Sequence, residues 1–399
     1  MKKIAIIGCG SSGLLCAIEC AKHNLSVDIY EQNNRCGKKI LASGNGRCNI
    51  TNLNITPKHY YTQNNDFIEK ILEKFSYKEI EQYFSELGVV FTKESDGRAF
   101  PYSKEAKSIA QLLETYAKKL GVKIYTNTKV TKLESGFILT CDTQRKKYDT
   151  VVLSSGSMAS KKLGADPSGY ELARSLGHTI APLYPALVQL KSNHKALKNL
   201  AGVRLEVELK LFVNGELGKI QRGDLLFTNY GLSGLAVLDI SSEASFALNN
   251  SDCVEVEADL LYEFSQAKLL HYLQKHQTKT KLPTQVILQN LLPKKLCDIF
   301  APDEQRLYGT KELKRVIYAL KHYRFNIDDT KGFEFAEVAG GGVDTKELHP
   351  LTCESKIVQN LFITGEVLDV VGQRGGYNFS FAWASGFLAA QAIIKKTKI

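Results

Sequence analysis

Residues 3–31 read KIAIIGCGSSGLLCAIECAKHNLSVDIYE and contain the clearest structural pattern in the chain. Lys3–Ile7 is a short apolar run that is typical of a buried β-strand, residues 14–22 predict a helix, and Ser26–Tyr30 predicts the next strand. The sequence GCGSSG (8–13) joins the first strand to the helix. This order of strand, glycine-rich turn, helix and strand is typical of a βαβ unit that binds a dinucleotide.

The residue types in this motif suit a dinucleotide. Gly8 allows the tight turn, Gly10 lets a pyrophosphate approach the backbone, and Gly13 lets the helix pack on the strand. The start of the helix would point free N–H groups at the phosphates. Glu31 follows about 20 residues later, where a carboxylate can accept hydrogen bonds from ribose hydroxyls. The cofactor contacts expected in this region are Gly8, Gly10, Ser11, Ser12, Gly13, Glu31 and Gln32.

Size and composition indicate a folded, globular protein of more than one domain. The chain has 399 residues, enough for two or three domains, and 44% of them are hydrophobic, which argues against global disorder. Glycines break the apolar N-terminal stretch, so a secretory signal is not expected. The sequence has no apolar run of about 20 residues that would predict a membrane helix. Nine cysteines with scattered spacing favour reduced thiols and a cytoplasmic location.

The net charge of +10 has two interpretations. It is compatible with an acidic partner such as RNA. However, Lys and Arg are dispersed and often adjoin Asp or Glu, without a long basic run. A solvated lysine-rich surface is therefore the more ordinary interpretation.

The pattern along the chain predicts a domain interrupted by an insertion. Residues 1–186 alternate strands and helices as a doubly wound α/β domain does, and residues 335–399 return to that character. Residues 187–334 predict an inserted domain. Its β part, 187–264, contains the alternating run Val203–Val213 followed by the hairpin signal Asn214-Gly215. Its helical part spans 265–325.

Two further strand ends favour FAD over NAD as the dinucleotide. An apolar strand ends at Gly365-Glu366, where many flavoproteins place a carboxylate on the ribityl chain, and another ends at Ser155-Gly156. No second strand–glycine–helix unit for NAD(P)H is present between 150 and 340. NAD(P)H would therefore reduce the flavin without a Rossmann domain of its own, or substrate would reduce it and oxygen reoxidise it.

Several longer motifs resemble the HI0933-like flavoprotein family, which includes the YhiN/BaiN and aminoacetone-oxidase-like proteins. The resemblance covers nearly the whole chain, and it implies a Rossmann-type FAD-binding domain with an inserted β domain that carries a helical subdomain. The family usually has His where Asn229 stands, which puts any role of that His in doubt. The matching motifs are GKKILASGNGRCNITN (37–52), GRAFP (97–101), GDLLFT (223–228), GLSG (231–234), TGEVLD (364–369) and GGYN (375–378).

The physical chemistry of these motifs suits a flavin. The loop at Ser43-Gly44 lets the backbone approach a planar ring, and Arg47 would place a fixed charge near the flavin or pyrophosphate, although a structural ion pair is the alternative. Gly375-Gly376 would expose N–H groups at a helix start facing the flavin, unless it is a plain capping loop. Cys48 is expected to line the cofactor or pack, rather than form a redox disulfide with Cys36. Further expected FAD contacts are Lys39, Val130, Tyr377 and Asn378.

The resemblance implies an FAD-dependent oxidoreductase that transfers a hydride at flavin N5 to or from a small organic substrate. Family names suggest an enone or steroid-like reductase, linked to NAD(P)H, or an amine oxidase that uses oxygen. An RNA-directed flavoprotein is the alternative. Candidate catalytic residues are Tyr377, Asn49 and Arg98, no metal ligands are expected, and the oligomeric state is open. We also expect Phe227–Ser233 to line a substrate cavity, the alternative being a turn inside the β domain.

Overall fold

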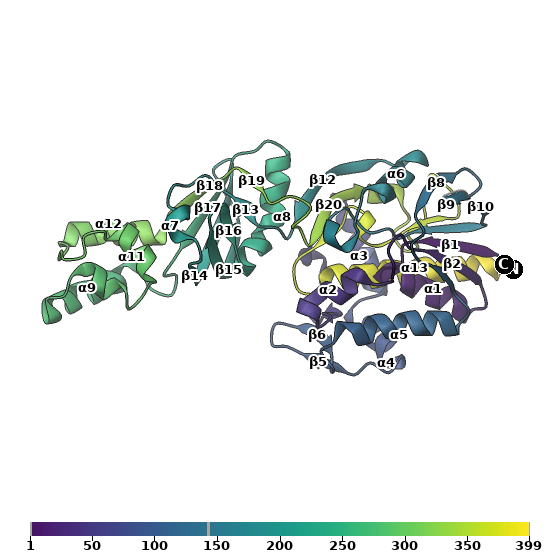
Figure 1. Cartoon of the computed structure of the whole chain (residues 1–399), viewed down its shortest axis with the longest axis horizontal. Helices are drawn as coiled ribbons and strands as arrows, with labels where there is room; N and C mark the ends of the chain where they lie inside the picture. Colours follow the sequence, from purple (N-terminus) through teal and green to yellow (C-terminus); the bar gives the residue numbers. More distant parts are fainter. Residues whose placement is uncertain (1, 142–143, 399) are drawn as a thin grey trace. The chain divides into compact units, whose positions relative to one another are not determined.

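The computed structural model describes residues 2–141 and 144–398. It divides into two units (Figure 1). The discontinuous unit comprises Met1–Tyr184 and Val338–Ile399, and the inserted unit comprises Pro185–Glu337. Both boundaries fall within three residues of the sequence-based ones.

A five-stranded parallel sheet forms the centre of the discontinuous unit, in the order β21-β11-β1-β2-β7. Because all neighbours run parallel, the carboxyl ends of the strands meet at one edge, and the order of the strands reverses at β1. In such sheets the ligand binds at that reversal. The strands are β1 (Lys3–Ile7), β2 (Ser26–Tyr30), β7 (Lys123–Tyr125), β11 (Thr150–Leu153) and β21 (Leu361–Ile363).

Helix α13 (Tyr377–Thr397) lies beside α1 (Ser11–Lys22), so the last helix of the chain packs on the first (Figure 1). Gly386 makes this packing close, since a Cβ there would lie 2.4 Å from the Ser12 carbonyl oxygen. The other helices of this unit are α2 (Lys38–Gly46), α3 (Asn65–Lys74), α4 (Tyr77–Glu86), α5 (Ala106–Lys119) and α6 (Ser168–Ser175).

Small sheets surround the central one. They are β3 (Thr51–Asn52) with β6 (Arg98–Pro101) and β5 (Phe91–Lys93); β8 (Val130–Glu134) with β9 (Ile138–Cys141) and β10 (Gln144–Lys147); β4 (Tyr60–Tyr61) with β22 (Val371–Gly372); and β12 (Ile180–Ala186) with β20 (Val338–Val343). The sequence predicts one helix over 67–87, whereas the structure has two, α3 and α4. Ser76 begins the second because Glu79 accepts hydrogen bonds from both its N–H and its hydroxyl, at 2.8 Å each.

The inserted unit contains a seven-stranded sheet in the order β18-β17-β14-β15-β16-β13-β19, antiparallel throughout. Helix α8 (Leu235–Asn249) packs on β15 and β14, and the β14–β15 hairpin turns at Asn214-Gly215 as its sequence predicts. The strands are β13 (Leu190–Lys191), β14 (Arg204–Val213), β15 (Glu216–Thr228), β16 (Gly231–Ser233), β17 (Val254–Asp259), β18 (Tyr323–Ile327) and β19 (Asp329–Thr330).

The helical piece of the inserted unit, residues 266–321, shares one hydrophobic core with the sheet, to which it contributes Leu269, Leu273 and Ile317. The sequence predicts one helical segment over 268–300, but three helices form because Pro283 and Pro293 stop propagation and stand just before α10 and α11. Helices α9 and α12 lie side by side (Figure 1). The helices are α9 (Gln266–Thr280), α10 (Thr284–Leu288), α11 (Lys294–Phe300) and α12 (Thr310–Lys321), and a short helix, α7 (Leu197–Leu200), precedes β14.

Within residues 2–141 and 144–398, no helix combines the length and apolarity that crossing a membrane requires.

Candidate functional site

The fingerprint loop, Gly8–Gly13, lies at the reversal of strand order. Gly8 has φ +107°, and a Cβ there would lie 2.3 Å from the Ser154 carbonyl oxygen. At Gly13 a Cβ would lie 2.2 Å from the carbonyl oxygen of Gly8, so the helix can approach the strand only with glycine. Gly10 differs, since no atom lies within 4 Å of its added Cβ. The loop is thus closed on two sides and open at Gly10, as a pyrophosphate requires.

Helix α1 begins at Ser11 with no side chain capping its first turn. Its first N–H groups are therefore available to an anion, and the dipole favours negative charge there. Ser12 is buried and lies close to the residue that follows β21 by two positions, Gly365. The closeness is shown by the 2.6 Å distance between the Ser12 Oγ and a Cβ built on Gly365. The start of α1 and the Gly365-Glu366 strand end are neighbours, although more than 350 residues separate them.

The Glu31 carboxylate is 8% exposed and holds the fingerprint loop. It accepts hydrogen bonds from the Cys9 N–H at 2.8 Å and from the backbone and side chain of Asn33 at 2.8 and 2.7 Å. Each carboxylate oxygen has two acceptor sites, so a ribose hydroxyl can still bind. Gln32 donates to the Gly164 carbonyl at 2.6 Å instead. Val130 opens β8 two residues after Thr128, whose N–H donates to the Glu31 carbonyl.

A disulfide joins Cys9 in the fingerprint loop to Cys36. The expectation of reduced thiols is therefore wrong for this pair. The two cysteines are 27 residues apart and lack any local motif, and they meet because the Gly37 N–H bonds to the Cys9 carbonyl at 2.8 Å. Cys48 is free and fully buried. Burial raises the pKa of its thiol to about 12, so Cys48 stays protonated at neutral pH.

Glu366 and Lys39 are brought together at the carboxyl edge of the sheet. The Lys39 Nζ lies 2.6 Å from Glu366 Oε2, and the Ser157 hydroxyl donates to Oε1 at 2.7 Å. The backbone N–H of Ala339 adds a bond at 3.3 Å. Ser157 was missed by sequence reasoning, because nothing in its local sequence signals a partner 209 residues away.

Polar atoms without partners collect near this edge. The Ser155 Oγ, the Thr364 Oγ1 and the Asn49 Oδ1 are buried and have no hydrogen-bond partner among the described residues. Buried polar groups are normally paired, so orphans at the end of a sheet indicate a polar ligand. Together with the open Gly10, they fit the polar groups of a dinucleotide. Gly156, with φ +76°, turns the chain away just after Ser155.

Arg47 and Arg98 share an acid. Arg47 Nη1 lies 3.1 Å from Glu94 Oε1, and Arg98 Nη2 lies 2.6 Å from Glu94 Oε2. Both guanidinium groups lie over the Phe100 ring. The structural ion pair that the sequence left as an alternative therefore exists, and a role in cofactor binding stays a prediction. Ser43 and Gly44 depart from helical geometry inside α2, as expected for a loop.

The second glycine pair lies before α13. Gly376 has φ +100°, and a Cβ there would lie 2.8 Å from the backbone of Thr51. Tyr377 begins the helix with its ring stacked on His59 at 4.3 Å. Asn378 closes the loop through two 2.8 Å bonds to Gly372. With Gly375, whose carbonyl accepts from Asn52 at 2.9 Å, these residues form a fixed turn rather than a mobile one.

Asp369 is a candidate acid that sequence reasoning missed, although it ends the TGEVLD motif. It is 6% exposed, and burial raises the pKa of its carboxyl group above the usual value near 3.8. A raised pKa favours the protonated form of the carboxyl group, and strongly shifted groups cluster at functional sites. Buried carboxyl groups of this kind recur at functional sites.

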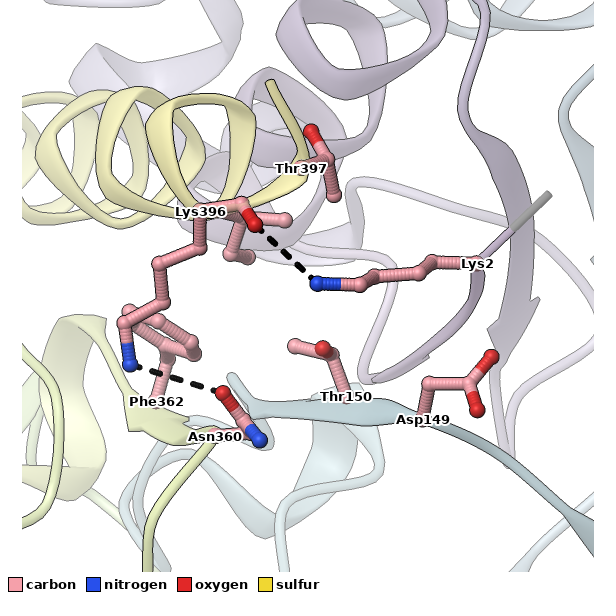
Figure 2. A pocket seen from close by; sticks show the side chains of 8 residues that line it. Lys2, Asp149, Thr150, Asn360, Phe362, Lys396 and Thr397 are labelled. Atoms are coloured by element: carbon pink, nitrogen blue, oxygen red, sulfur yellow. Dashed lines mark hydrogen bonds between the residues drawn. The ribbon is translucent and has the colours of Figure 1, made fainter. Parts of the chain in front are cut away.

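A pocket lined by Lys2, Asp149, Thr150, Asn360 and Phe362 lies at the opposite edge of the sheet (Figure 2). These residues stand at the amino ends of β1, β11 and β21, whereas the fingerprint loop follows the carboxyl end of β1. This pocket is therefore not the dinucleotide site. The described residues also contain no group of three His, Cys, Asp or Glu that could hold a metal ion.

Phe227–Ser233 forms a hairpin in the inserted sheet, where β15 pairs with β16. A Cβ on Gly231 would lie 2.1 Å from the Leu190 carbonyl oxygen, and one on Gly234 would lie 2.3 Å from that of Asp224. Packing within the sheet therefore explains both glycines. Phe227–Ser233 is thus a turn within the β domain, and its lining of a substrate cavity stays a prediction.

Known proteins resemble this chain over nearly its whole length. The model of the HI0933-like protein Rossmann domain matches residues 2–392. The 3-dehydro-bile acid delta(4,6)-reductase of Clostridium scindens is 38% identical over 99% of this chain and 100% of its own. The ribosomal RNA dihydrouridine synthase of Haemophilus influenzae is 33% identical over 98% of both chains.

A solved structure supports the fold. The 3-ketosteroid delta1-dehydrogenase from Sterolibacterium denitrificans aligns with a TM-score of 0.53 over 99% of this chain and all of its own, at 12% identity. The family match and the whole-chain relatives agree with the Rossmann-type site built from the two ends of the sequence. This chain therefore belongs to the HI0933-like family and is an FAD-dependent oxidoreductase.

Proposed function

We propose that this enzyme reduces a carbon–carbon double bond that is conjugated to a carbonyl group. FAD supplies the hydride at N5 when it is bound. The observation that carries the proposal is the chemistry shared by two whole-chain relatives with different substrates. A 3-dehydro-Δ4,6 steroid has its double bonds conjugated to the C3 ketone, and uracil has its C5–C6 double bond conjugated to the C4 carbonyl.

The residues of this chain would bind and orient the cofactor and handle a proton. In this proposal Glu31 would bind the ribose of the adenosine half, and Glu366, with Lys39 beside it, would bind the ribityl chain. Hydride addition to the β carbon of a conjugated carbonyl leaves the α carbon in need of a proton. Asp369 is the proton donor that we propose: it is 6% exposed at the end of the TGEVLD motif, and burial raises the pKa of its carboxyl group above the usual value. Tyr377 is the alternative donor.

The reductant we propose is NADH or NADPH, bound transiently, because the sequence contains no second dinucleotide fingerprint. A cytoplasmic location, where these reductants are abundant, agrees with this proposal. A small conjugated ketone is the first candidate substrate. A uracil base in RNA is the second, favoured by the net charge of +10 and by relatives that act on ribosomal RNA.

Anaerobic flavin absorbance tests the proposal. NADH or NADPH should bleach the visible flavin band of the purified protein, and a Δ4,6-3-ketosteroid or a uridine-containing RNA should restore it. Oxygen-dependent turnover of aminoacetone, with no reoxidation by either conjugated compound, would instead identify an amine oxidase and refute the proposal.

A further inference from the structure

Charge is unevenly distributed within the inserted unit. The helical piece, 266–321, contains eleven Lys and Arg but only four Asp and Glu. The remainder of the inserted unit, residues 185–265 and 322–337, contains nine Lys and Arg and fifteen Asp and Glu. A basic segment is thus attached to an acidic sheet, a contrast that the summed charge of the chain conceals.

Helix α9 carries a basic stripe with an aromatic ring. Lys268, Lys275 and Lys279 are spaced by seven and four residues, so they share one side of the helix, and all three are exposed. Tyr272 lies on the same side, half-buried, with its ring tilted against that of His276 at a centroid distance of 4.5 Å. The helix contains no Asp or Glu. Leu269 and Leu273 of this helix are buried in the core, whereas the three lysines are exposed.

Helix α12 repeats this pattern. Lys311, Lys314 and Arg315 are exposed on the side away from the core, and Tyr318 on the same side is 60% exposed. Tyr318 lies against His322 with centroids 4.5 Å apart. The one acid of the helix, Glu312, is paired with Arg306 at 2.6 Å.

The acids of the helical piece leave most of its cations without a partner. Asp298 and Glu304 both pair with Lys294, and Glu312 pairs with Arg306. Uncompensated like charges on adjacent helices destabilise the fold slightly, so their concentration here favours an external anion. Within residues 266–321, all of which the structure describes, the cations without an ion pair are Lys268, Lys275, Lys279, Lys281, Lys295, Lys311, Lys314 and Arg315; of these, Lys295 donates to the Ala201 carbonyl.

We propose that the outer sides of α9 and α12 bind RNA. Lysine and arginine neutralise the phosphate backbone, and the exposed ring of Tyr318 provides a surface on which an unstacked base can lie, whereas Tyr272 is half-buried. A bile-acid-like substrate has at most one carboxylate and requires no such surface. The inference rests on the proposed reductase and assigns the binding surface for its RNA substrate candidate.

Fluorescence anisotropy with a labelled, uridine-containing RNA hairpin tests the surface. The triple variant K311E/K314E/R315E should lose at least about tenfold in affinity, and its log–log salt slope should fall by about 2, since single-stranded contacts contribute about 0.7 each. The control K74E/K107E/K119E makes the same charge change at exposed lysines of α3 and α5. It should change affinity less than about threefold. An equal loss of RNA affinity in both variants, or no loss in K311E/K314E/R315E, would refute the proposed RNA-binding surface.

A tyrosine variant separates stacking from charge. Tyr318→Ala should weaken RNA binding by about 5- to 100-fold, the effect of one base–aromatic contact, without changing the salt slope, whereas Tyr318→Phe should bind normally. Circular dichroism of each variant reports its folding. Binding of anionic-lipid vesicles by the unaltered protein, without measurable RNA binding, would identify a membrane surface and refute the inference.

Flavin reoxidation by the unaltered protein tests the proposed reductase separately from the proposed RNA surface. If a ketosteroid reoxidises its flavin but the variants of α12 bind RNA as tightly as it does, the RNA surface is wrong and the reductase stands. If neither a ketosteroid nor RNA reoxidises the flavin, the reductase is wrong whatever the anisotropy shows.

Discussion

The three glycines of the fingerprint loop have different structural roles. Gly8 and Gly13 are required by backbone atoms that a side chain would strike, whereas Gly10 faces open space. A substitution at Gly10 therefore tests cofactor binding without disturbing the packing of the loop, which a substitution at Gly8 or Gly13 would disturb. The same motif thus contains residues that serve the fold and one that serves the cofactor.

Gly10→Val should leave the protein folded and abolish stoichiometric FAD, because the new side chain would fill the space where the pyrophosphate approaches. We expect FAD affinity to fall by about 100-fold or more, roughly 2.7 kcal/mol. Gly13→Ala should instead destabilise the fold itself by about 1–3 kcal/mol, since its Cβ would strike the Gly8 carbonyl. Flavin content and urea unfolding of both variants check this, and full FAD retention by Gly10→Val would refute it.

Glu366→Ala should weaken FAD binding more than folding. Losing a charged hydrogen bond costs about 1.5–3 kcal/mol, or about 10- to 100-fold in affinity. The variant also leaves Lys39 without its 2.6 Å partner, so Glu366→Gln is the matched control that keeps the side chain's shape. Fluorescence titration of the apoprotein with FAD measures both, and an unchanged dissociation constant for Glu366→Ala would assign the acid another role.

Asp369 should impose a pH dependence on stability. The native pKa lies above the unfolded one, so the folded state binds the proton more tightly, and stability falls as pH rises from the ordinary value near 3.8 towards the native pKa. Asp369→Asn removes this cost and should be the more stable protein at neutral pH, with the difference vanishing at low pH. Urea unfolding across pH measures it, and a difference that is constant with pH would contradict the raised pKa.

At the scale of elements, the sequence predicts the ends of helices and strands well where the signal for them lies within a few residues. The βαβ unit and the Asn214-Gly215 hairpin were predictable because their signals lie within a few residues. The division at Ser76 depends on two hydrogen bonds that Ser76 donates to the Glu79 carboxylate, and the helical pattern that runs through both helices conceals it.

Ser76→Ala should destabilise the protein by about 1 kcal/mol, since it removes the hydroxyl that caps α4. Ser85→Ala, at an exposed position within the same helix, is the control and should be neutral. Thermal unfolding compares the two, and equal melting temperatures would show that the cap contributes nothing.

Sequence predicts single parts of the site better than their partners. Lys39 and Glu366 were each expected near the cofactor, but their contact joins residues 327 positions apart and depends on tertiary packing. The Cys9–Cys36 disulfide and the orphaned Ser155 hydroxyl are invisible locally for the same reason. Pro283 and Pro293 are visible in the sequence, and each indicates the end of a helix. The amphipathic spacing of the residues around them nevertheless predicts a single helical segment, which is wrong.

At the scale of the whole molecule, the distribution of charge carries information that its sum does not. A net charge of +10 is compatible with an ordinary solvated surface. Its concentration on α9 and α12, beside an acidic sheet, is what favours a polyanionic partner. Dispersed lysines along a sequence thus need a structure before they can be assigned to one side of a helix.

The packing of α13 on α1 also sets an order of events during synthesis. The glycine loop near residue 10 leaves the ribosome first, but the strand end at Glu366 and the turn at Gly376 that complete its surroundings come out last. In the interval, the inserted unit, which has its own hydrophobic core, can fold as an independent module. The cofactor can be held only once the chain has been synthesised beyond Gly376, so a nascent chain truncated before residue 360 should be colourless however much FAD the cell supplies.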